Sequence, residues 1–452
     1  MDKSADLCSD RWLGYEYARR YSLRVLCHRF STRSIRHGPR FRNYNIVQRR
    51  NQLHTPACYN RSSSQPRFLP RADQPVAKKS LSVISRIASV GHLSSVSPVK
   101  LKFRRFGLEL AHRWTIARGL EAGGGGGTSS FQVVLLELLD QDGIAGLGEA
   151  APSARYQENV DSTIAFLEHI NPERLSFDDI QGSMRYLDGI AGGNFAPKGA
   201  VNIALLDGAA RKAGKPIYDF LKLGFTEKKH LTSFSIGIDK PEIIRQKVLE
   251  AERYPILKLK VGSPGDKENL AALRAASRKK NVRVDANEGW KTKEEALKQI
   301  ERLAADGHIE FVEQPMPATA DTRDLAWLKK RAPLPIMADE SYLSAKDLPH
   351  CAECYHAVNV KLVKAGGISG AFEALQAARR AGLKTMIGCM IESSVLISAG
   401  AHLAELADYL DLDGNLLITN DPFKGVTAEK GMLSFSNAAE ERGLRVSARP
   451  VQ

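Results

Sequence analysis

The sequence predicts an α/β protein with a parallel (β/α) barrel, and the stretch from Ile256 to Met390 carries the clearest pattern for it. The first observation is a set of short apolar runs, each ending in a charged residue: Lys260, Asp285, Glu313, Asp339 and Lys361. The second is their spacing. Successive charges are 25, 28, 26 and 22 residues apart (285−260, 313−285, 339−313, 361−339), which suits a strand, a loop and a helix. Because the C-terminal strand ends of such a barrel converge, these charges are expected to share one pocket.

The segments between these runs have the spacing of amphipathic helices. Asp266–Lys279 and Thr292–Ala305 repeat small or apolar residues every three to four positions. Thr232–Ile238 is expected to form the first barrel strand. Thr385–Cys389 and Ala407–Asp411 are expected to form the last two strands.

An α+β capping domain is predicted before the barrel. It begins near Val99 with a strand in which side-chain character alternates. The expected strands are Lys100–Phe106, Phe131–Leu139 and Gly143–Gly148, and the expected helices are Asn159–Ile170, Phe177–Leu187 and Pro197–Ala213. The predicted division of the chain is therefore residues 1–97 as an extension, 98–230 as the cap, 231–420 as the barrel and 421–452 as a C-terminal segment.

The extension carries the net charge of the chain. Residues 1–100 contain 19 Lys and Arg and 5 Asp and Glu, a balance of 19 − 5 = +14 that equals the net charge of all 452 residues. This composition fits a disordered extension, a stretch absent from the mature protein, or an organellar transit peptide. Asp2, Asp6 and Asp10 argue against a transit peptide. A basic nucleic-acid or surface-binding arm is the non-enzymatic alternative, although no binding motif supports it.

The remaining residues are charge-balanced, with 65 − 19 = 46 basic and 51 − 5 = 46 acidic side chains. No nucleic-acid partner is therefore expected for the folded body. The six cysteines show no disulfide framework, and Cys351-Ala-Glu-Cys354 is interpreted as chance spacing within a helix. No apolar run is long enough to cross a membrane. A cytoplasmic location is expected, or an organelle if residues 1–97 are a transit peptide.

Three predicted strand ends carry carboxylates, and these are candidate metal ligands. Asp285, Glu313 and Asp339 offer hard oxygen ligands of the kind that Mg²⁺ prefers. No histidine occupies these strand ends, which argues against zinc. The sequence therefore predicts a magnesium site at the mouth of the barrel.

Two lysines are expected to flank that site. Lys260 lies on the strand before the carboxylates and Lys361 on the strand after them. In a closed barrel these positions face each other, which suits removal of a proton α to a carboxylate from one face and its return to the other. The structural alternative is a set of salt bridges at the barrel end.

Five motifs in order resemble the enolase superfamily, within its muconate-lactonizing subgroup. They are Lys258-Leu-Lys260, Asp285-Ala-Asn287, Val312-Glu-Gln-Pro315, Ala338-Asp-Glu-Ser341 and Asn359-Val-Lys361-Leu-Val-Lys364-Ala-Gly-Gly367. The resemblance covers roughly residues 99–445. It implies a (β/α)₇β modified TIM barrel, with an N-terminal α+β cap completed by the C-terminal segment. It also implies Lys260 and Lys361 as the acid/base pair and Lys258 as a residue that steadies the substrate carboxylate.

Asp411-Leu-Asp413, at the end of the last predicted strand, resembles the motif with which dipeptide epimerases of this family hold the substrate ammonium group. Two carboxylates suit a cation and would repel a second substrate carboxylate. The alternative is a solvated turn before Gly414. By position, Ser235 and Cys389 are expected to line the pocket, with a plain core role as the alternative.

The segment from Arg118 to Thr128 contains five consecutive glycines and is either a mobile lid or an exposed hairpin loop. Related epimerases that act on L-Ala-L-Glu place an arginine in this loop. Here Arg118 is the candidate substrate-binding residue, or Glu121 selects a basic side chain instead.

The sequence thus indicates an isomerase, a dipeptide epimerase or racemase that uses one Mg²⁺ per subunit. It is expected to transfer a proton at the C-terminal residue of an L-Ala-L-Glu-like or other L,L-dipeptide by a two-lysine acid/base mechanism. The positive charges of the metal and of the second lysine are expected to lower the pKa of the lysine that acts as base. The enzymatic alternatives are muconate cycloisomerase, o-succinylbenzoate synthase and N-acylamino acid racemase. The expected partner is a small dipeptide substrate. No membrane partner is expected, and the sequence leaves open whether the chain forms a homo-oligomer.

Overall fold

The computed structural model describes residues 99–121 and 127–450. The predicted extension, residues 1–97, lies outside the described residues, as do residues 122–126 of the glycine-rich loop. Within the described part of the chain, no helix is both long and apolar enough to cross a membrane.

The predicted barrel is confirmed. Eight described strands form one parallel sheet in sequence order: β4 (Phe234–Ile236), β5 (Ile256–Lys260), β6 (Asn281–Asp285), β7 (Ile309–Glu313), β8 (Ile336–Ala338), β9 (Ala357–Lys361), β10 (Lys384–Gly388) and β11 (Tyr409–Asp411). The ends of the sheet meet through a parallel bridge between Thr232 and Leu410, and the Ser233 N–H donates to the Leu410 carbonyl at 3.2 Å. The barrel is therefore nearly closed, and its strand ends surround one mouth.

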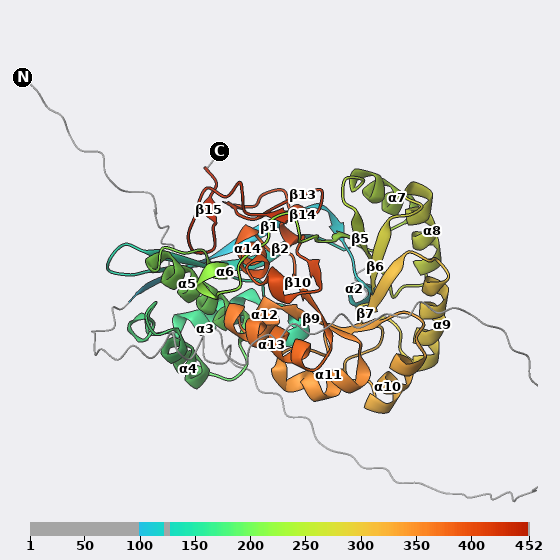
Figure 1. Cartoon of the computed structure of the whole chain (residues 1–452), viewed down its shortest axis with the longest axis horizontal. Helices are drawn as coiled ribbons and strands as arrows, with labels where there is room; N and C mark the ends of the chain where they lie inside the picture. Colours follow the sequence, from blue (N-terminus) through green and yellow to red (C-terminus); the bar gives the residue numbers. More distant parts are fainter. Residues whose placement is uncertain (1–98, 122–126, 451–452) are drawn as a thin grey trace, which may run out of the picture. The chain divides into compact units, whose positions relative to one another are not determined.

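Helices follow the barrel strands and lie outside the sheet (Figure 1). They are α7 (Pro241–Glu250), α8 (Asp266–Ala276), α9 (Lys293–Ala304), α10 (Thr322–Arg331), α11 (Leu348–Cys354), α12 (Leu362–Ala365), α13 (Ile368–Arg380) and α14 (Ser394–Ala401). Ala296, Ile300 and Leu303 of α9 are buried, as their three- and four-residue spacing predicts. Helix α8 ends three residues before the predicted Lys279, because Ser277 adopts an extended conformation.

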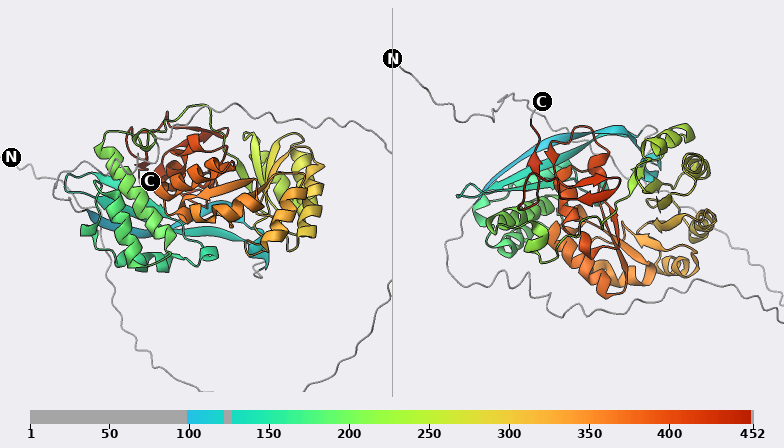
Figure 2. Two further views of the ribbon diagram at one scale, coloured as in Figure 1. Left: turned by 60° about the horizontal axis from the view of Figure 1, so that its bottom comes forward. Right: turned by 45° about the horizontal axis from the view of Figure 1, so that its top comes forward.

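The cap contains an antiparallel three-stranded sheet of β1 (Lys100–Trp114), β2 (Thr128–Leu139) and β3 (Ala145–Ala150). Its helices are α3 (Val160–Glu168), α4 (Ile180–Ile190), α5 (Phe195–Lys212) and α6 (Ile217–Phe220). Helix α5 packs against β3 (Figure 2), where a Cβ at Gly148 would lie 2.1 Å from the Ala200 carbonyl oxygen. Only glycine permits this approach.

The first strand continues past the predicted end at Phe106. Its register with β2 shifts between Glu109 and Trp114. Within this shift and just after the strand, the chain contacts the barrel. The Ala111 N–H donates to the Leu417 carbonyl, and the Ile238 N–H donates to the Thr115 carbonyl, each at 2.9 Å. Strand β1 and the short helix α2 (Ala117–Glu121) that follows it therefore lie at the mouth of the barrel.

The C-terminal segment returns to the cap, as the resemblance to the enolase superfamily implies. It contains β12 (Phe423–Lys424) paired with β15 (Ser447–Ala448), and β13 (Thr427–Glu429) paired with β14 (Met432–Ser434). The Leu444 N–H donates to Asp207 of α5 at 2.7 Å, and the Ile217 N–H donates to the Gly443 carbonyl at 3.0 Å. Gly443 has φ +62°, and a Cβ there would lie 1.9 Å from the Asp207 carboxylate.

Candidate active site

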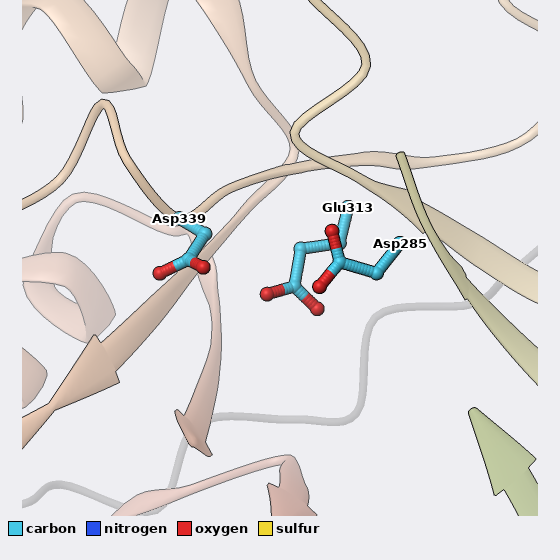
Figure 3. A group of neighbouring side chains, drawn as sticks. All are labelled: Asp285, Glu313 and Asp339. Carbon is cyan, nitrogen blue, oxygen red and sulfur yellow. The ribbon is translucent and has the colours of Figure 1, made fainter. Parts of the chain in front are cut away.

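Three carboxylates converge at the mouth of the barrel. Asp285 ends β6, Glu313 ends β7, and Asp339 follows the last residue of β8. One oxygen from each lies within 4.8 Å of the others, and Figure 3 shows the side chains pointing toward one another. All three are at most 1 % exposed. The structure therefore brings together the three residues predicted to bind a metal.

This group has the chemistry of a magnesium site. Its donors are carboxylate oxygens alone, without a histidine or cysteine that would favour zinc. Burial and the nearby charge of Asp285 raise the pKa of Glu313 to about 7. A divalent cation would relieve this mutual repulsion of buried carboxylates. The residues present therefore fit Mg²⁺.

Lys258 lies inside the barrel, among the carboxylates. Its Nζ is 2.6 Å from Asp411 Oδ2, 2.7 Å from Glu313 Oε2 and 3.2 Å from Asp285 Oδ2. Burial alone would lower the pKa of Lys258, but the charges of these three carboxylates outweigh it and raise the pKa well above its usual value. Lys258 is thus a permanent countercharge, and it does not line the cavity described below.

Replacement of Lys258 by methionine should destabilise the protein. The change leaves three buried carboxylates without their shared cation, a loss that costs about 3–5 kcal/mol in comparable buried pairs. Urea unfolding in the presence of a chelator measures the difference. Lys384→Met, which removes an exposed partner of Asp408, is the control and should have little effect. Equal midpoints for the two variants would contradict the countercharge role.

Lys260 and Lys361 approach the carboxylate group from different strands. Lys260 Nζ on β5 is 2.6 Å from Asp285 Oδ2, and Lys361 Nζ on β9 is 2.9 Å from Asp339 Oδ2. Burial opposes the charge of Lys361, but Asp339 and Glu313 outweigh burial and raise the pKa of Lys361 well above its usual value. Strands β6, β7 and β8 separate the two lysines, as predicted.

A cavity of about 800 Å³ lies over this group, between the barrel mouth and the cap. Predicted site residues line it: Lys260, Lys361, Asp411, Asp413, Ser235, Cys389 and Arg118. The cap contributes residues from β1 and β2 and from the turn that contains Tyr156. The structure thus places both lysines, the Asp411-Leu-Asp413 motif and Arg118 around one space.

Asp411 and Asp413 lie at the end of β11 and are both buried. Asp411 accepts hydrogen bonds from the Ser233 hydroxyl at 2.7 Å and from Lys258 at 2.6 Å. Asp413 accepts the Ser235 N–H at 2.6 Å, and Cys389 Sγ lies 3.7 Å from its other oxygen. Burial and the charge of Asp411 raise the pKa of Asp413 to about 7. A cation in the cavity would favour the ionised pair.

Arg118 on α2 is already engaged by acids of the barrel. Its Nη1 contacts Glu340, lies 3.1 Å from Glu288 Oε2 and lies 3.4 Å from the Asn287 carbonyl. Glu340 and Glu288 were not predicted as site residues, although each lies within three positions of a predicted metal ligand. The side chain of Glu121, the other candidate for substrate selection, lies outside the described residues.

Sequence reasoning also missed the residues that orient the carboxylates. Lys364 contacts the Asp339 side chain and donates to its carbonyl at 2.6 Å. The Asn359 amide donates to Glu313 Oε1 at 2.8 Å. Gln314 Oε1 accepts the Asp339 N–H at 2.9 Å. All three lie within motifs of the sequence, so their proximity to the ligands is the signal that could have found them.

Family models match both halves of the folded body. Residues 124–222 match the description "Mandelate racemase / muconate lactonizing enzyme, N-terminal domain". Residues 243–421 match "Enolase C-terminal domain-like".

Known proteins resemble the chain over the same region. An L-Ala-D/L-amino acid epimerase of Pedosphaera parvula is 62% identical over 351 residues, which are 78% of this chain and 100% of the relative. An L-Ala-D/L-Glu epimerase of Bacteroides thetaiotaomicron is 36% identical over 75% of this chain and 86% of the relative. The crystal structure of a dipeptide epimerase from Enterococcus faecalis, complexed with Mg and L-Leu-L-Tyr, is similar with a TM-score of 0.69 and 30% identity, covering 78% of this chain and 100% of that one.

Proposed function

The chain belongs to the enolase superfamily, among the mandelate racemase and muconate lactonizing enzymes, and on this premise we propose that it is a Mg²⁺-dependent dipeptide epimerase that uses Lys260 and Lys361 as its two bases. The observation that carries the proposal is the placement of these lysines on separate sides of a buried carboxylate group, in one cavity with Asp411 and Asp413.

Each part of the cavity suits one part of a dipeptide. Asp411 and Asp413 hold the α-ammonium group, and the two lysines flank the α-carbon of the C-terminal residue. When bound to Asp285, Glu313 and Asp339, Mg²⁺ supplies Lewis-acid stabilisation of the negative charge that develops on the substrate carboxylate.

One lysine removes the α-proton and the other returns a proton to the opposite face, so that one must be neutral while the other is charged. The surrounding carboxylates raise the pKa of Lys361. The positive charge of a divalent cation held by the same carboxylates would lower this pKa. Lys258 keeps its charge and acts on the carboxylates rather than on the α-carbon.

The proposed location is the cytoplasm. The described cysteines Cys351, Cys354 and Cys389 are unpaired. Unpaired thiols fit a reducing compartment. Cys351 and Cys354 are buried within and at the end of α11, which agrees with chance spacing in a helix.

The test is proton exchange in D₂O with substrates that differ only at the amino terminus. A free dipeptide such as L-Ala-L-Leu should exchange and epimerise at its C-terminal residue, and its N-acetylated form should not, because Asp411 and Asp413 require a cation. Preferred turnover of N-acyl amino acids, muconate or a succinylbenzoate precursor would assign the chain to one of the alternative activities instead.

Substrate affinity should depend on pH through Asp413. Because its pKa is raised to about 7, Asp413 is protonated and uncharged below this pH and attracts the substrate ammonium group less strongly. KM for a dipeptide should therefore rise as pH falls through about 7, with a smaller effect on kcat. Steady-state kinetics between pH 5.5 and 8.5, compared with Asp413→Asn, measure this. If KM of the Asp413→Asn variant rises in the same way as pH falls, a group other than Asp413 is responsible for the pH dependence.

A further inference from the structure

We infer that the cavity selects dipeptides whose C-terminal residue has an uncharged, apolar side chain. This inference rests on the proposed function and concerns the same cavity. It differs from both alternatives that the sequence leaves open, in which Arg118 selects an acidic side chain or Glu121 a basic one.

The positive charge of Arg118 is already balanced within the protein. Arg155 forms a two-point ion pair with Glu288, with Nε–Oε2 and Nη2–Oε1 distances of 2.8 Å each. Arg118 contacts the same Glu288 and also Glu340. These two arginines and two glutamates sum to 2 − 2 = 0 charges, so the group offers no net attraction to an anion.

Releasing Arg118 to a substrate carboxylate would be costly. The Glu340 side chain is 1 % exposed and the Glu288 side chain 9 % exposed. An acidic substrate that displaced Glu340 from Arg118 would leave this buried carboxylate without its ion-pair partner, which costs more than an exposed ion pair returns, whereas Glu288 would keep its pair with Arg155.

An apolar group also faces the cavity. Trp114, Ile116 and Phe131 of the cap and Leu417 after β11 line it, and all four are half-buried, so that part of their apolar surface remains open. Apart from the arginines, the other cap side chains that line the cavity are uncharged: Thr115, Thr128, Ser153, Ala154 and Tyr156. Arg113 also lines it, but this side chain is exposed to solvent and donates to the Gly127 carbonyl at 2.9 Å. Its charge is therefore screened.

The geometry of a bound dipeptide directs the side chain to this apolar part. The two lysines line the barrel side of the cavity beside the carboxylate group, and Asp411 and Asp413 line it at and just after the end of β11. With the substrate carboxylate, α-carbon and ammonium group held there, the C-terminal side chain is left to face the cap. An apolar side chain gains from burial against these residues, whereas a charged one loses its water, and Arg118, Glu288 and Glu340 are already paired with one another.

The first experiment compares kcat/KM for epimerisation of L-Ala-L-Leu, L-Ala-L-Phe, L-Ala-L-Glu and L-Ala-L-Lys by the full chain with Mg²⁺. The apolar substrates should exceed both charged ones by about tenfold or more. Preference for the Glu or the Lys dipeptide would overturn the inference while leaving the epimerase function standing. Failure of all four to exchange would refute the proposed function and the inference with it.

The second experiment shifts the charge balance. Glu288→Gln removes one negative charge from the group and leaves Arg118 and Arg155 in excess, so the ratio of kcat/KM for L-Ala-L-Glu to that for L-Ala-L-Leu should rise about tenfold. Glu310→Gln is the matched control, because Glu310 pairs with Arg283 at 2.8 Å and does not line the cavity. The ratio is taken within one preparation, so it does not depend on the folded fraction. An unchanged ratio in Glu288→Gln would overturn the inference.

Discussion

Removal of divalent cations should abolish α-proton exchange, and added Mg²⁺ should restore it. The reason is the arrangement of Asp285, Glu313 and Asp339, whose oxygens lie within 4.8 Å of one another and which are almost completely buried. Without a cation, the negative charge that develops on the substrate would face three carboxylates. We expect a loss of about 10³-fold or more, since a bound metal contributes several kcal/mol at such a step. Exchange in chelator-treated, dialysed protein measures the effect.

A matched pair of variants separates metal binding from general damage. Glu313 ends β7 and Glu310 lies on the same strand, but Glu310 pairs with Arg283. Glu313→Gln should weaken Mg²⁺ binding in a calorimetric titration that involves no turnover, and Glu310→Gln should bind as the original chain does. Full activity of the chelator-treated protein, or equal Mg²⁺ affinity in both variants, would contradict the site.

The barrel could be predicted because its signals are local and repeat. Three predicted strands match the observed bounds of β5, β7 and β9, because each apolar run ends in a charged residue: Ile256–Lys260, Ile309–Glu313 and Ala357–Lys361. Once strands are parallel and adjacent in sequence order, their C-terminal ends must meet. The carboxylate group therefore followed from spacing alone.

The partners of Arg118 could not be predicted in the same way. Glu288 and Glu340 are 170 and 222 residues away in sequence, and they meet Arg118 only because β1 runs past Phe106 to the barrel mouth. The extension of β1 depends on contacts with Leu417 and Ile238, which no local pattern encodes. Sequence position suggested a side chain free to bind substrate, and tertiary structure surrounds it with acids.

Lys258 shows a second limit of prediction from sequence spacing. Residues two apart on a strand share a face, so Lys258 and Lys260 lie on the same face of β5. The spacing does not predict how deeply each lysine is buried in the barrel. Lys258 is 1 % exposed and contacts three carboxylates, whereas Lys260 reaches the cavity and lies 5.9 Å from the centre of the Trp114 ring. The same spacing thus yields one countercharge and one candidate base.

Removal of either candidate base should abolish α-proton exchange in a different epimer of the dipeptide. Lys260→Ala should abolish exchange of the α-proton in one epimer of the dipeptide but retain exchange in the other, and Lys361→Ala should show the reverse preference. The remaining lysine can still remove a proton from its own face and return deuterium to the same face. Net epimerisation requires both lysines, so it should fall by about 10²- to 10⁴-fold in each variant.

Lys260→Arg and Lys361→Arg separate charge from proton transfer. Arginine keeps the positive charge beside Asp285 or Asp339, but it does not lose a proton near neutral pH. The arginine variants should therefore lose the same face-specific exchange as the alanine variants while disturbing the carboxylates less. Deuterium incorporation into the L,L and L,D dipeptides, followed separately by NMR, distinguishes the faces. Near-normal epimerisation by any one of the four variants would rule out the two-lysine mechanism, because no single base can act on both faces of the α-carbon.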